Sequence, residues 1–353
     1  MIIIILHAVC KLFRFFHGGK AFVRGPEAYG KRLNPAVRLC YTVRIGILQQ
    51  NTGAVRAPVR ERRVVSVTGI IDVGGGMRGI YGAGVLDYCL DNGIRFDYCI
   101  GVSAGSANIA SYLAGQRGRN YRFYMEYSFR RRYMSLRNWV GCGSYLDLDY
   151  VYGELSKRGG EDPLDYAKLA ASDSVMKVVA LNARTGEPIY FDKADLRQDD
   201  YRILMASSSL PVACRPYFVR GVPCYDGGVA DPVPLDKAFA DGCDRVVLVL
   251  TKPVDFLRKQ RKDAPAARVL RRRYPRAAEQ LMLRFRKYND GVARAGELAR
   301  QGRVLMIAPD DCCGMKTLTK DRERMDRLYR KGYSDAREIP RFCAQSTGPA
   351  RTA

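Results

Sequence analysis

The sequence predicts an α/β fold in which helices cover both faces of a parallel or mixed β-sheet. Short runs rich in valine and isoleucine alternate along the chain with segments whose apolar residues recur at helical spacing. These runs are apolar throughout, as in strands that are buried on both faces. With 353 residues, 47% of them hydrophobic, the chain is long enough to bury a large core.

The first elements repeat the order strand, turn and helix. We expect a strand at 64–73, a glycine-rich turn at 74–79, a helix at 80–92, a strand at 96–102 and a helix at 104–114. Gly93 and Gly115 follow the two helices, where glycine commonly ends them. Ser103 therefore occupies a turn between a strand and a helix.

The later elements are less regular. Residues 117–163 are aromatic and basic, and we expect helices and loops there over one edge of a site. The other expected elements are a strand at 175–182, an extended segment at 188–192, a helix at 199–209, a hairpin at 217–225, a helix at 236–240, strands at 245–251 and 304–308, and a helix at 320–331.

By pattern, the chain divides into four parts. Residues 1–63 form a poorly patterned basic extension, 64–250 a central domain, 251–336 a basic helical and strand part packed on that domain, and 337–353 a tail. The apolar run at 2–6 is too short to span a bilayer and follows no basic residue. We therefore expect neither a membrane span nor a secretory signal in the extension.

The composition limits cofactors and the compartment. Eleven cysteines lie without regular pair spacing, and the two histidines, His7 and His17, precede the first expected strand. We expect reduced thiols in a cytoplasmic protein, and no metal site.

The net charge of +23 points to an anionic partner. One basic run contains Arg258, Lys259, Arg261, Lys262, Arg268, Arg271, Arg272, Arg273, Arg276, Arg284, Arg286 and Lys287. No aromatic ladder or nucleic-acid motif accompanies this run, so we expect contact with an anionic membrane rather than specific nucleic-acid binding. The alternative is a solvated helical face that keeps the protein soluble.

The sequence Gly-Val-Ser-Ala-Gly at 101–105 fits a nucleophile elbow. In this motif Gly101 and Gly105 permit a sharp turn that exposes the hydroxyl of Ser103. A serine hydroxyl is a weak nucleophile until a base takes its proton. Because no histidine follows Ser103, a Ser-His-Asp triad is not expected in the patterned region. A carboxylate is the remaining candidate base.

The glycine-rich turn is a candidate oxyanion hole. It comprises Gly74, Gly75, Gly76, Met77, Arg78 and Gly79. Residues without a Cβ allow successive backbone N–H groups to approach one anion closely. Arg78 adds positive charge, and the N–H of Ala104 at the start of a helix is a further donor. We expect these groups to stabilise the oxyanion that forms when a serine attacks an ester carbonyl.

Asp226 is the candidate base. It ends an extended run, and Gly227 and Gly228 after it permit the chain to depart sharply. An aspartate with a pKa near 3.9 is a weak base. We therefore expect partial desolvation of this carboxylate together with strong stabilisation of the oxyanion.

These three segments, in this order and with these separations, resemble the signature of the patatin-like phospholipase family. The resemblance covers about 64–234 well and continues loosely to about residue 336. It implies a three-layer α/β/α fold with a mainly parallel central sheet, and a catalytic domain at 64–250. It also implies a dyad in which Ser103 is the nucleophile and Asp226 the base, with the oxyanion hole at 74–79 and no cofactor.

The expected function is hydrolysis of lipid acyl esters through an acyl-serine, by a phospholipase A or lysophospholipase-like serine esterase. Its substrate would be a phospholipid or lysophospholipid, and its location cytoplasmic or peripheral on the inner face of the membrane. An acyltransferase or a lipid-binding regulator on the same fold remains an alternative. A dinucleotide-binding protein is less favoured, because the strand after the G-x-G-x-x-G pattern leads into Ser103 and has no acid at its end for a ribose.

Overall fold

One central sheet organises residues 66–344, which are the residues that the computed structural model describes. Its strands are β1 (Thr68–Asp72), β2 (Tyr98–Val102), β3 (Val175–Asn182), β4 (Pro188–Asp192), β5 (Tyr217–Val219), β6 (Val222–Asp226), β7 (Arg245–Val249) and β8 (Val304–Ile307). The strand order is β5-β6-β3-β2-β1-β7-β8, and β4 pairs with β3. The described residues belong to one compact unit. The extension expected at 1–63 lies outside the described residues.

The sheet is parallel in its centre and antiparallel at one side. Strands β3, β2, β1, β7 and β8 run parallel to their neighbours in this series, whereas β4 and β6 pair with β3 in the antiparallel sense, as β5 does with β6. The predicted α/β class with a mainly parallel sheet is confirmed. Because parallel strands share one direction, their carboxyl ends meet at one edge of the sheet, where ligands bind in such folds.

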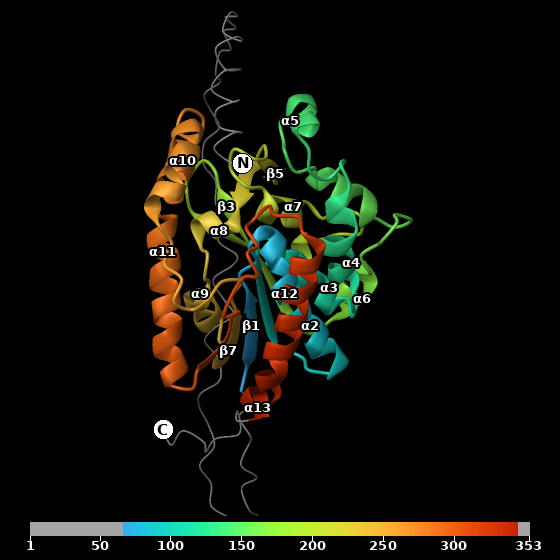
Figure 1. The fold of residues 1–353 in the computed structure, drawn as a ribbon, viewed down its shortest axis with the longest axis vertical. Helices are drawn as coiled ribbons and strands as arrows, with labels where there is room; N and C mark the ends of the chain where they lie inside the picture. Colours follow the sequence, from blue (N-terminus) through green and yellow to red (C-terminus); the bar gives the residue numbers. More distant parts are fainter. Residues whose placement is uncertain (1–65, 345–353) are drawn as a thin grey trace, which may run out of the picture. The chain divides into compact units, whose positions relative to one another are not determined.

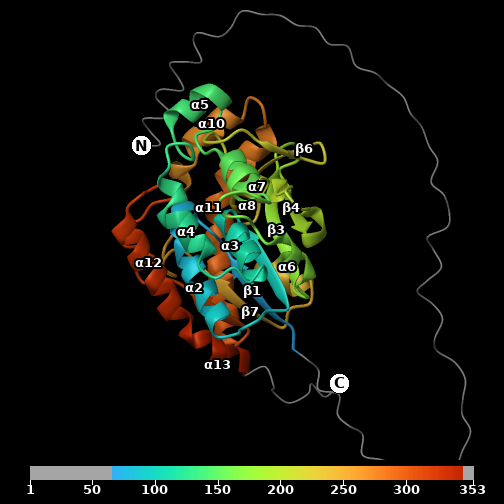
Figure 2. The same ribbon diagram turned by 90° about the vertical axis from the view of Figure 1, so that its right-hand side faces the viewer.

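Helices cover the sheet on both faces (Figure 1). They are α2 (Ile80–Asp91), α3 (Ala104–Leu113), α4 (Arg119–Met125), α5 (Leu136–Cys142), α6 (Tyr166–Ala171), α7 (Arg202–Ser208), α8 (Gly227–Ala230), α9 (Leu235–Ala240), α10 (Ala264–Leu270), α11 (Pro275–Arg300), α12 (Arg322–Asp335) and α13 (Ile339–Ala344). Helices α2, α3, α4 and α12 lie on one side of the sheet, and α9 and α11 lie on the other. Figure 2 views the molecule from the side of α2, α3 and α4.

The central strands β1, β2 and β7 are largely apolar because both of their faces are buried. Ile70 of β1 packs into the core on the α2 side, whereas the next residue, Ile71, packs into the core that includes residues of α9 and α11. Val247 and Leu248 of β7 divide between the same two cores. Alternate side chains of a strand point to opposite faces, so a strand covered on both faces has no polar side.

Helix α11 spans 26 residues, although the sequence suggested only a basic run there. Its buried face includes Leu281, Tyr288 and Ala295, which recur at seven-residue spacing. Lysines and arginines cover much of the rest of the helix surface, which explains why the apolar stripe is easily overlooked.

Two expectations for the C-terminal part need correction. The helix expected at 320–331 begins at Arg322 and continues to Asp335. The tail expected from 337 onward is helical through Ala344, because Ile339 and Phe342 are buried in the core on the α2 side. Among the helices of residues 66–344, none combines the length and the apolar composition that a membrane span requires.

Candidate functional site

Ser103 sits in a strained turn between β2 and α3. Its φ of 57° and ψ of −129° lie in a region that side chains other than glycine rarely adopt, at a cost of about 1 to 3 kcal/mol. The turn is fixed by hydrogen bonds, because the Ser103 N–H donates to Ser207 Oγ at 2.9 Å and the Ser103 carbonyl accepts from Ser106 Oγ at 2.6 Å. Gly101 precedes the turn and Gly105 follows it. The geometry is that of the expected elbow.

Strand β3 brings Ser103 and Asp226 together. Val102, the residue before Ser103, pairs with Val179 of β3, and Asp226 pairs with Ala180, the next residue of the same strand. Ser103 Oγ donates a hydrogen bond to Asp226 Oδ2 at 2.6 Å. Both residues of the expected dyad are thus in direct contact, at the carboxyl end of β2.

Asp226 is held by the start of α8. Its Oδ1 accepts a hydrogen bond from the Gly228 N–H at 2.8 Å, and its own N–H donates to the Ser209 carbonyl at 2.8 Å. Gly227 is the first residue of α8. Burial raises the pKa of Asp226 above its ordinary value, and the charge of Arg284 and the hydrogen bonds from Ser103 and Gly228 oppose this rise.

Arg284 is a site residue that the sequence interpretation placed in a basic run. Its Nε is buried and makes no hydrogen bond with any residue in the described part of the chain. A Cβ at Gly228 would lie 3.3 Å from Arg284 Nη2 and 3.1 Å from Asp226 Oδ1, so this glycine leaves room for both groups. A usable signal was the seven-residue spacing that relates Arg284 to the buried Ala277 and Leu298 of α11.

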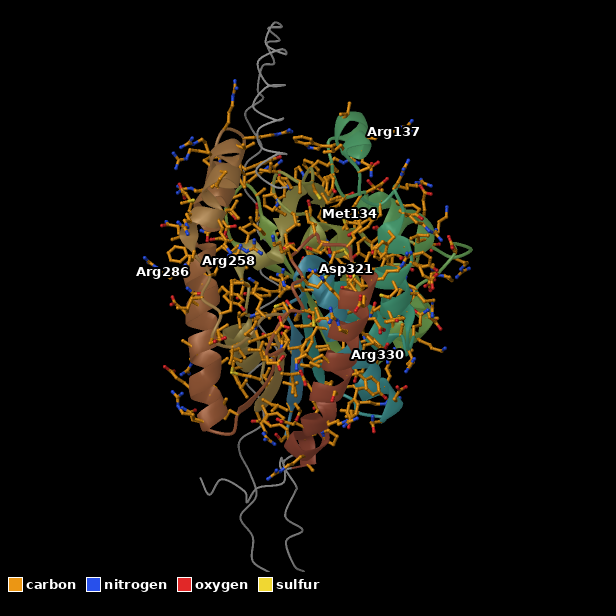
Figure 3. The ribbon with its side chains drawn as sticks, in the orientation of Figure 1. Met134, Arg137, Arg258, Arg286, Asp321 and Arg330 are labelled. Carbon is orange, nitrogen blue, oxygen red and sulfur yellow. The ribbon has the colours of Figure 1, made fainter. Side chains whose placement is uncertain are left out.

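The remaining basic run is mostly exposed. Figure 3 shows Arg286 pointing outward from α11, whereas Arg258 lies on the inner side of that helix. Arg258 forms an ion pair with Asp263 at 2.9 Å. The expectation of a solvated basic face therefore applies to Arg286 and its exposed neighbours but not to Arg258 or Arg284.

The glycine-rich turn lies against the elbow. Gly74, Gly75 and Gly76 all have positive φ, at 63°, 129° and 62°. A Cβ at Gly74 would lie 2.2 Å from the Val102 carbonyl oxygen and 3.0 Å from the Ala104 nitrogen. Only glycine fits there, and the backbone of the turn therefore touches the backbone on both sides of Ser103.

The expected oxyanion donors divide into two groups. The Gly74 N–H donates to Asp72 Oδ1 at 2.8 Å, and the Met77 N–H donates to the Thr317 carbonyl at 2.9 Å. Gly79 begins the following helix as its N-cap residue. In contrast, the N–H groups of Gly75, Gly76 and Ala104 have no hydrogen-bond partner among residues 66–344. These three are the donors left available for a ligand.

Arg78 anchors the turn to other parts of the chain. Its Nε donates to the Thr251 carbonyl at 3.2 Å and its Nη1 donates to Thr317 Oγ1 at 3.3 Å. The Thr251 hydroxyl in turn donates to the Gly74 carbonyl. Two of its three guanidinium nitrogens are used in this way, so Arg78 holds the turn in place; the positive charge that the sequence suggested near the oxyanion remains a prediction.

Asp72 is a second buried carboxyl beside the turn. It is 0% exposed, and burial raises its pKa to about 6, although hydrogen bonds from Asn108 and the Gly74 N–H lower it. Asn108 donates from the same amide nitrogen to the Gly79 carbonyl. Asp72 and Asn108 therefore connect the two ends of the glycine-rich turn.

Ser103 lines a cavity that opens to solvent, and the empty space of the cavity together with its opening is about 810 Å³. Most of its wall is apolar or aromatic and comes from α3, α4 and 146–155, while Thr317 and Leu318 add a wall from the C-terminal part. The apolar and aromatic lining residues include Phe123, Tyr133, Leu146, Leu148, Val151, Tyr152 and Leu155. A hydroxyl that donates to a carboxylate in the wall of a largely apolar cavity suits attack on an ester with an alkyl chain.

No group of metal-ligating side chains occurs among the described residues.

Residues 73–239 match the model of the patatin-like phospholipase family. Residues 73–239 thus carry a patatin-like phospholipase domain, as the sequence predicted. Residues 274–342, which include Arg284 and Thr317, match a second model described as a domain of unknown function, DUF6363.

A relative and a solved structure are similar to this chain. The uncharacterized protein YjjU of Escherichia coli (strain K12) is 29% identical over 185 residues, which are 51% of this chain and 50% of that protein. The chain thus matches about half the length of this curated relative. This chain is also similar to the crystal structure of VipD from Legionella pneumophila, with 14% sequence identity and a TM-score of 0.40. The alignment covers 80% of this chain and 67% of the VipD chain.

Proposed function

We propose that this protein hydrolyses acyl esters of lipids with Ser103 as nucleophile and Asp226 as base. The observation that carries the proposal is the 2.6 Å hydrogen bond from Ser103 Oγ to Asp226 Oδ2 in the wall of a largely apolar cavity. The match to the patatin-like phospholipase model supports lipid hydrolysis as the reaction class. A phospholipid or lysophospholipid is the proposed substrate.

In the first half of the reaction, Ser103 Oγ attacks the ester carbonyl carbon while its proton passes to Asp226 Oδ2. The tetrahedral intermediate then expels the alcohol, which takes this proton, and an acyl-serine remains. Asp226 must be ionised to accept the proton. Arg284 favours that ionised state, because its positive charge lowers the pKa of the buried carboxyl.

The N–H groups of Gly75, Gly76 and Ala104 stabilise the oxyanion in this proposal. Gly76 and Ala104 line the same cavity as Ser103, Gly75 precedes Gly76 in the turn, and each N–H is free of other hydrogen bonds within the described residues. Loss of one such donor typically costs about 10² to 10³ in rate. Positive φ at Gly75 and Gly76 means that a substitution at either position would disturb this arrangement.

Water completes the cycle. Asp226 takes a proton from a water molecule, the resulting hydroxide attacks the acyl carbon, and Ser103 leaves with the proton that Asp226 returns. The products are the fatty acid and the free enzyme. An alcohol in place of water would give acyl transfer by the same steps.

The substrate is proposed to reach the site from an anionic membrane surface on the cytoplasmic side. Helix α5 lies between the cavity-lining residues Tyr133 and Leu146, and it exposes Leu136 by 59% and Val140 by 81%. Helices α5 and α10 lie at the same end of the molecule (Figures 1 and 2), and the exposed arginines at the end of α10 add positive charge there. Apolar side chains beside basic ones favour binding at an anionic lipid surface.

The test compares the wild type with Ser103→Ala and Asp226→Asn on a lysophospholipid and on a 4-nitrophenyl ester. Both variants should lose at least about 10³ in kcat, while the exposed Asp236→Asn control keeps wild-type activity. An organophosphonate should label the wild type but not Ser103→Ala. Hydrolysis that persists in Ser103→Ala would refute the dyad.

Two further arms separate the alternatives. Addition of glycerol during turnover distinguishes transfer, which yields an acylglycerol, from hydrolysis, which yields fatty acid alone. Replacement of His7 and His17 by alanine should leave the rate unchanged, because the proposed base is a carboxylate. A large loss of activity in that double variant would assign the base to a histidine.

A further inference from the structure

The cavity that Ser103 lines is not uniform in chemical character. Near Ser103 it is lined by Ala104 and Ala107 of α3, but its lining also includes Arg119, Ser156 and Asp162. Among the described residues that line it, Arg119 and Asp162 are the only Asp, Glu, Lys or Arg residues. One part of an otherwise apolar cavity is therefore charged.

The charged part lies away from Ser103, toward the C-terminal end of α3. Arg119 Nη1 donates to Ser111 Oγ at 3.0 Å. Ser111 comes eight residues after Ser103 in α3, and a helix rises about 1.5 Å per residue, which separates the two levels by about 12 Å. An extended alkyl chain with carbon–carbon bonds near 1.5 Å covers this distance with roughly eight to ten carbons.

The guanidinium of Arg119 is buried and incompletely satisfied. Its Nη2 donates to Ser156 Oγ at 2.8 Å and to the Asp162 carbonyl at 2.9 Å. Its Nε is buried and has no hydrogen-bond partner within residues 66–344, although Asp162 Oδ1 lies 3.6 Å away. A buried N–H without a partner is uncommon in folded proteins and unfavourable.

The charge at this end is also unbalanced. Asp162 accepts two hydrogen bonds at 3.0 Å from Arg122, one to each carboxylate oxygen. One carboxylate is thus shared by two guanidinium groups, and the set of three side chains carries a net charge of +1. A single anion would balance this charge and could accept the free N–H of Arg119.

We propose that the cavity recognises acyl chains of roughly eight to ten carbons whose far end carries a carboxylate, which binds Arg119. The inference rests on the proposed function, because it requires the acyl chain of the ester to occupy the cavity. A chain that ends in a methyl group would leave the buried Nε–H of Arg119 without an acceptor. A terminal carboxylate instead supplies an acceptor for this N–H. Esters of dicarboxylic acids are the substrate class that follows.

The experiment compares two 4-nitrophenyl esters of equal length, the octanoate and the mono-ester of octanedioate. The wild type should hydrolyse the octanedioate ester with a kcat/KM at least about tenfold higher, the effect expected of one hydrogen bond to a charged group. In Arg119→Met this preference should disappear. Arg117→Met is the matched control, because Arg117 is exposed, pairs with Asp91 and is absent from the cavity lining; it should keep the preference.

A binding measurement separates this inference from the proposed function. Calorimetry with Ser103→Ala should show tighter binding of monoethyl octanedioate than of ethyl octanoate, whether or not the enzyme hydrolyses either ester. Equal kcat/KM values for the two esters in the wild type would overturn the inference and leave the esterase intact. Absence of all hydrolysis, together with carboxylate-dependent binding, would overturn the proposed function and keep the binding site.

Discussion

Ser103 Oγ and Asp226 Oδ2 lie 2.6 Å apart although the two residues come from strands that do not pair with each other. Their proximity depends on β3, which pairs with the end of β2 through Val179 and with the end of β6 through Ala180. A shift of one residue in either pairing would separate the hydroxyl from the carboxylate. The sheet register is therefore part of the proposed catalytic geometry.

Ser103→Gly should make the protein more stable while it abolishes hydrolysis. Ser103 has a positive φ, and glycine adopts such angles without steric cost, so the free energy of unfolding should rise by about 1 kcal/mol. Ser103→Ala removes the hydroxyl but keeps the Cβ, and it should gain none of this increment. Urea unfolding of both variants measures the difference. Equal stabilities would show that the elbow stores no strain.

Arg284→Met should move the acid limb of the activity profile to higher pH. The positive charge of Arg284 lowers the pKa of Asp226, which burial raises, so its removal leaves the base protonated over a wider range. Activity at pH 5 should then fall more than activity at pH 8, as seen in kcat/KM for a soluble ester. Arg286→Met, on the exposed side of the same helix, is the control and should leave the profile unchanged. A uniform loss at all pH values in Arg284→Met would contradict an electrostatic role.

Asp72→Asn should stabilise the protein at pH 7 by at most about 3 kcal/mol. The pKa of Asp72 rises from 3.8 to about 6 on folding, a shift of about two units at 1.36 kcal/mol each. The folded state binds this proton more tightly, so the Asp72 contribution to the free energy of unfolding falls as pH rises from about 4 to 6. The asparagine oxygen can still accept the Gly74 N–H.

Urea titrations between pH 4 and pH 7 measure this effect. The difference in stability between Asp72→Asn and the wild type should grow with pH across that window and then level off. The exposed Asp236→Asn should show no such growth. If the difference in free energy of unfolding between Asp72→Asn and the wild type does not change with pH, Asp72 acts only through its hydrogen bonds.

Replacement of Leu136 and Val140 by glutamine should weaken binding to anionic vesicles at least about tenfold. Both side chains are exposed on α5, and burial of such side chains in a lipid surface is favourable by about 1.5 to 3 kcal/mol each. Hydrolysis of a soluble ester should not change. Val175→Gln, at the start of β3 and 45% exposed, is the control. Vesicle co-sedimentation that is equal for all three proteins would place the lipid contact elsewhere.

Local patterns were enough to predict the strand ends at the site. The run before Gly74, the elbow around Ser103 and the extended segment before Asp226 all carry their signal within about ten residues, because strand burial and glycine turns are local properties. The helix at 80–92 was likewise found as α2, within one residue at its C-terminal end. The approach of Asp226 to Ser103 could be inferred only from the family resemblance.

Other features depend on contacts between distant residues. Which N–H groups of the glycine-rich turn remain free is decided by Asp72 and by Thr317, and the latter lies 240 residues after Met77. The burial of Arg284 depends on which side of α11 faces the sheet. Arg119 became part of the cavity through α4, in a segment where the sequence showed no clear periodicity. Side-chain partners of this kind are not encoded by any local pattern.

The position of Arg284 and Thr317 has a consequence for how genomes are read. The two residues belong to the region matched by the second family model, whereas the serine and aspartate belong to the first. The boundary between the two matched sequence regions thus runs through the proposed reaction centre. A homologue that has only the first region would keep the residue proposed as nucleophile but lack Arg284. Similarity over that region alone is therefore a poor basis for assuming the same pH optimum of activity. Surveys that score both regions together would sort such enzymes by the chemistry they share.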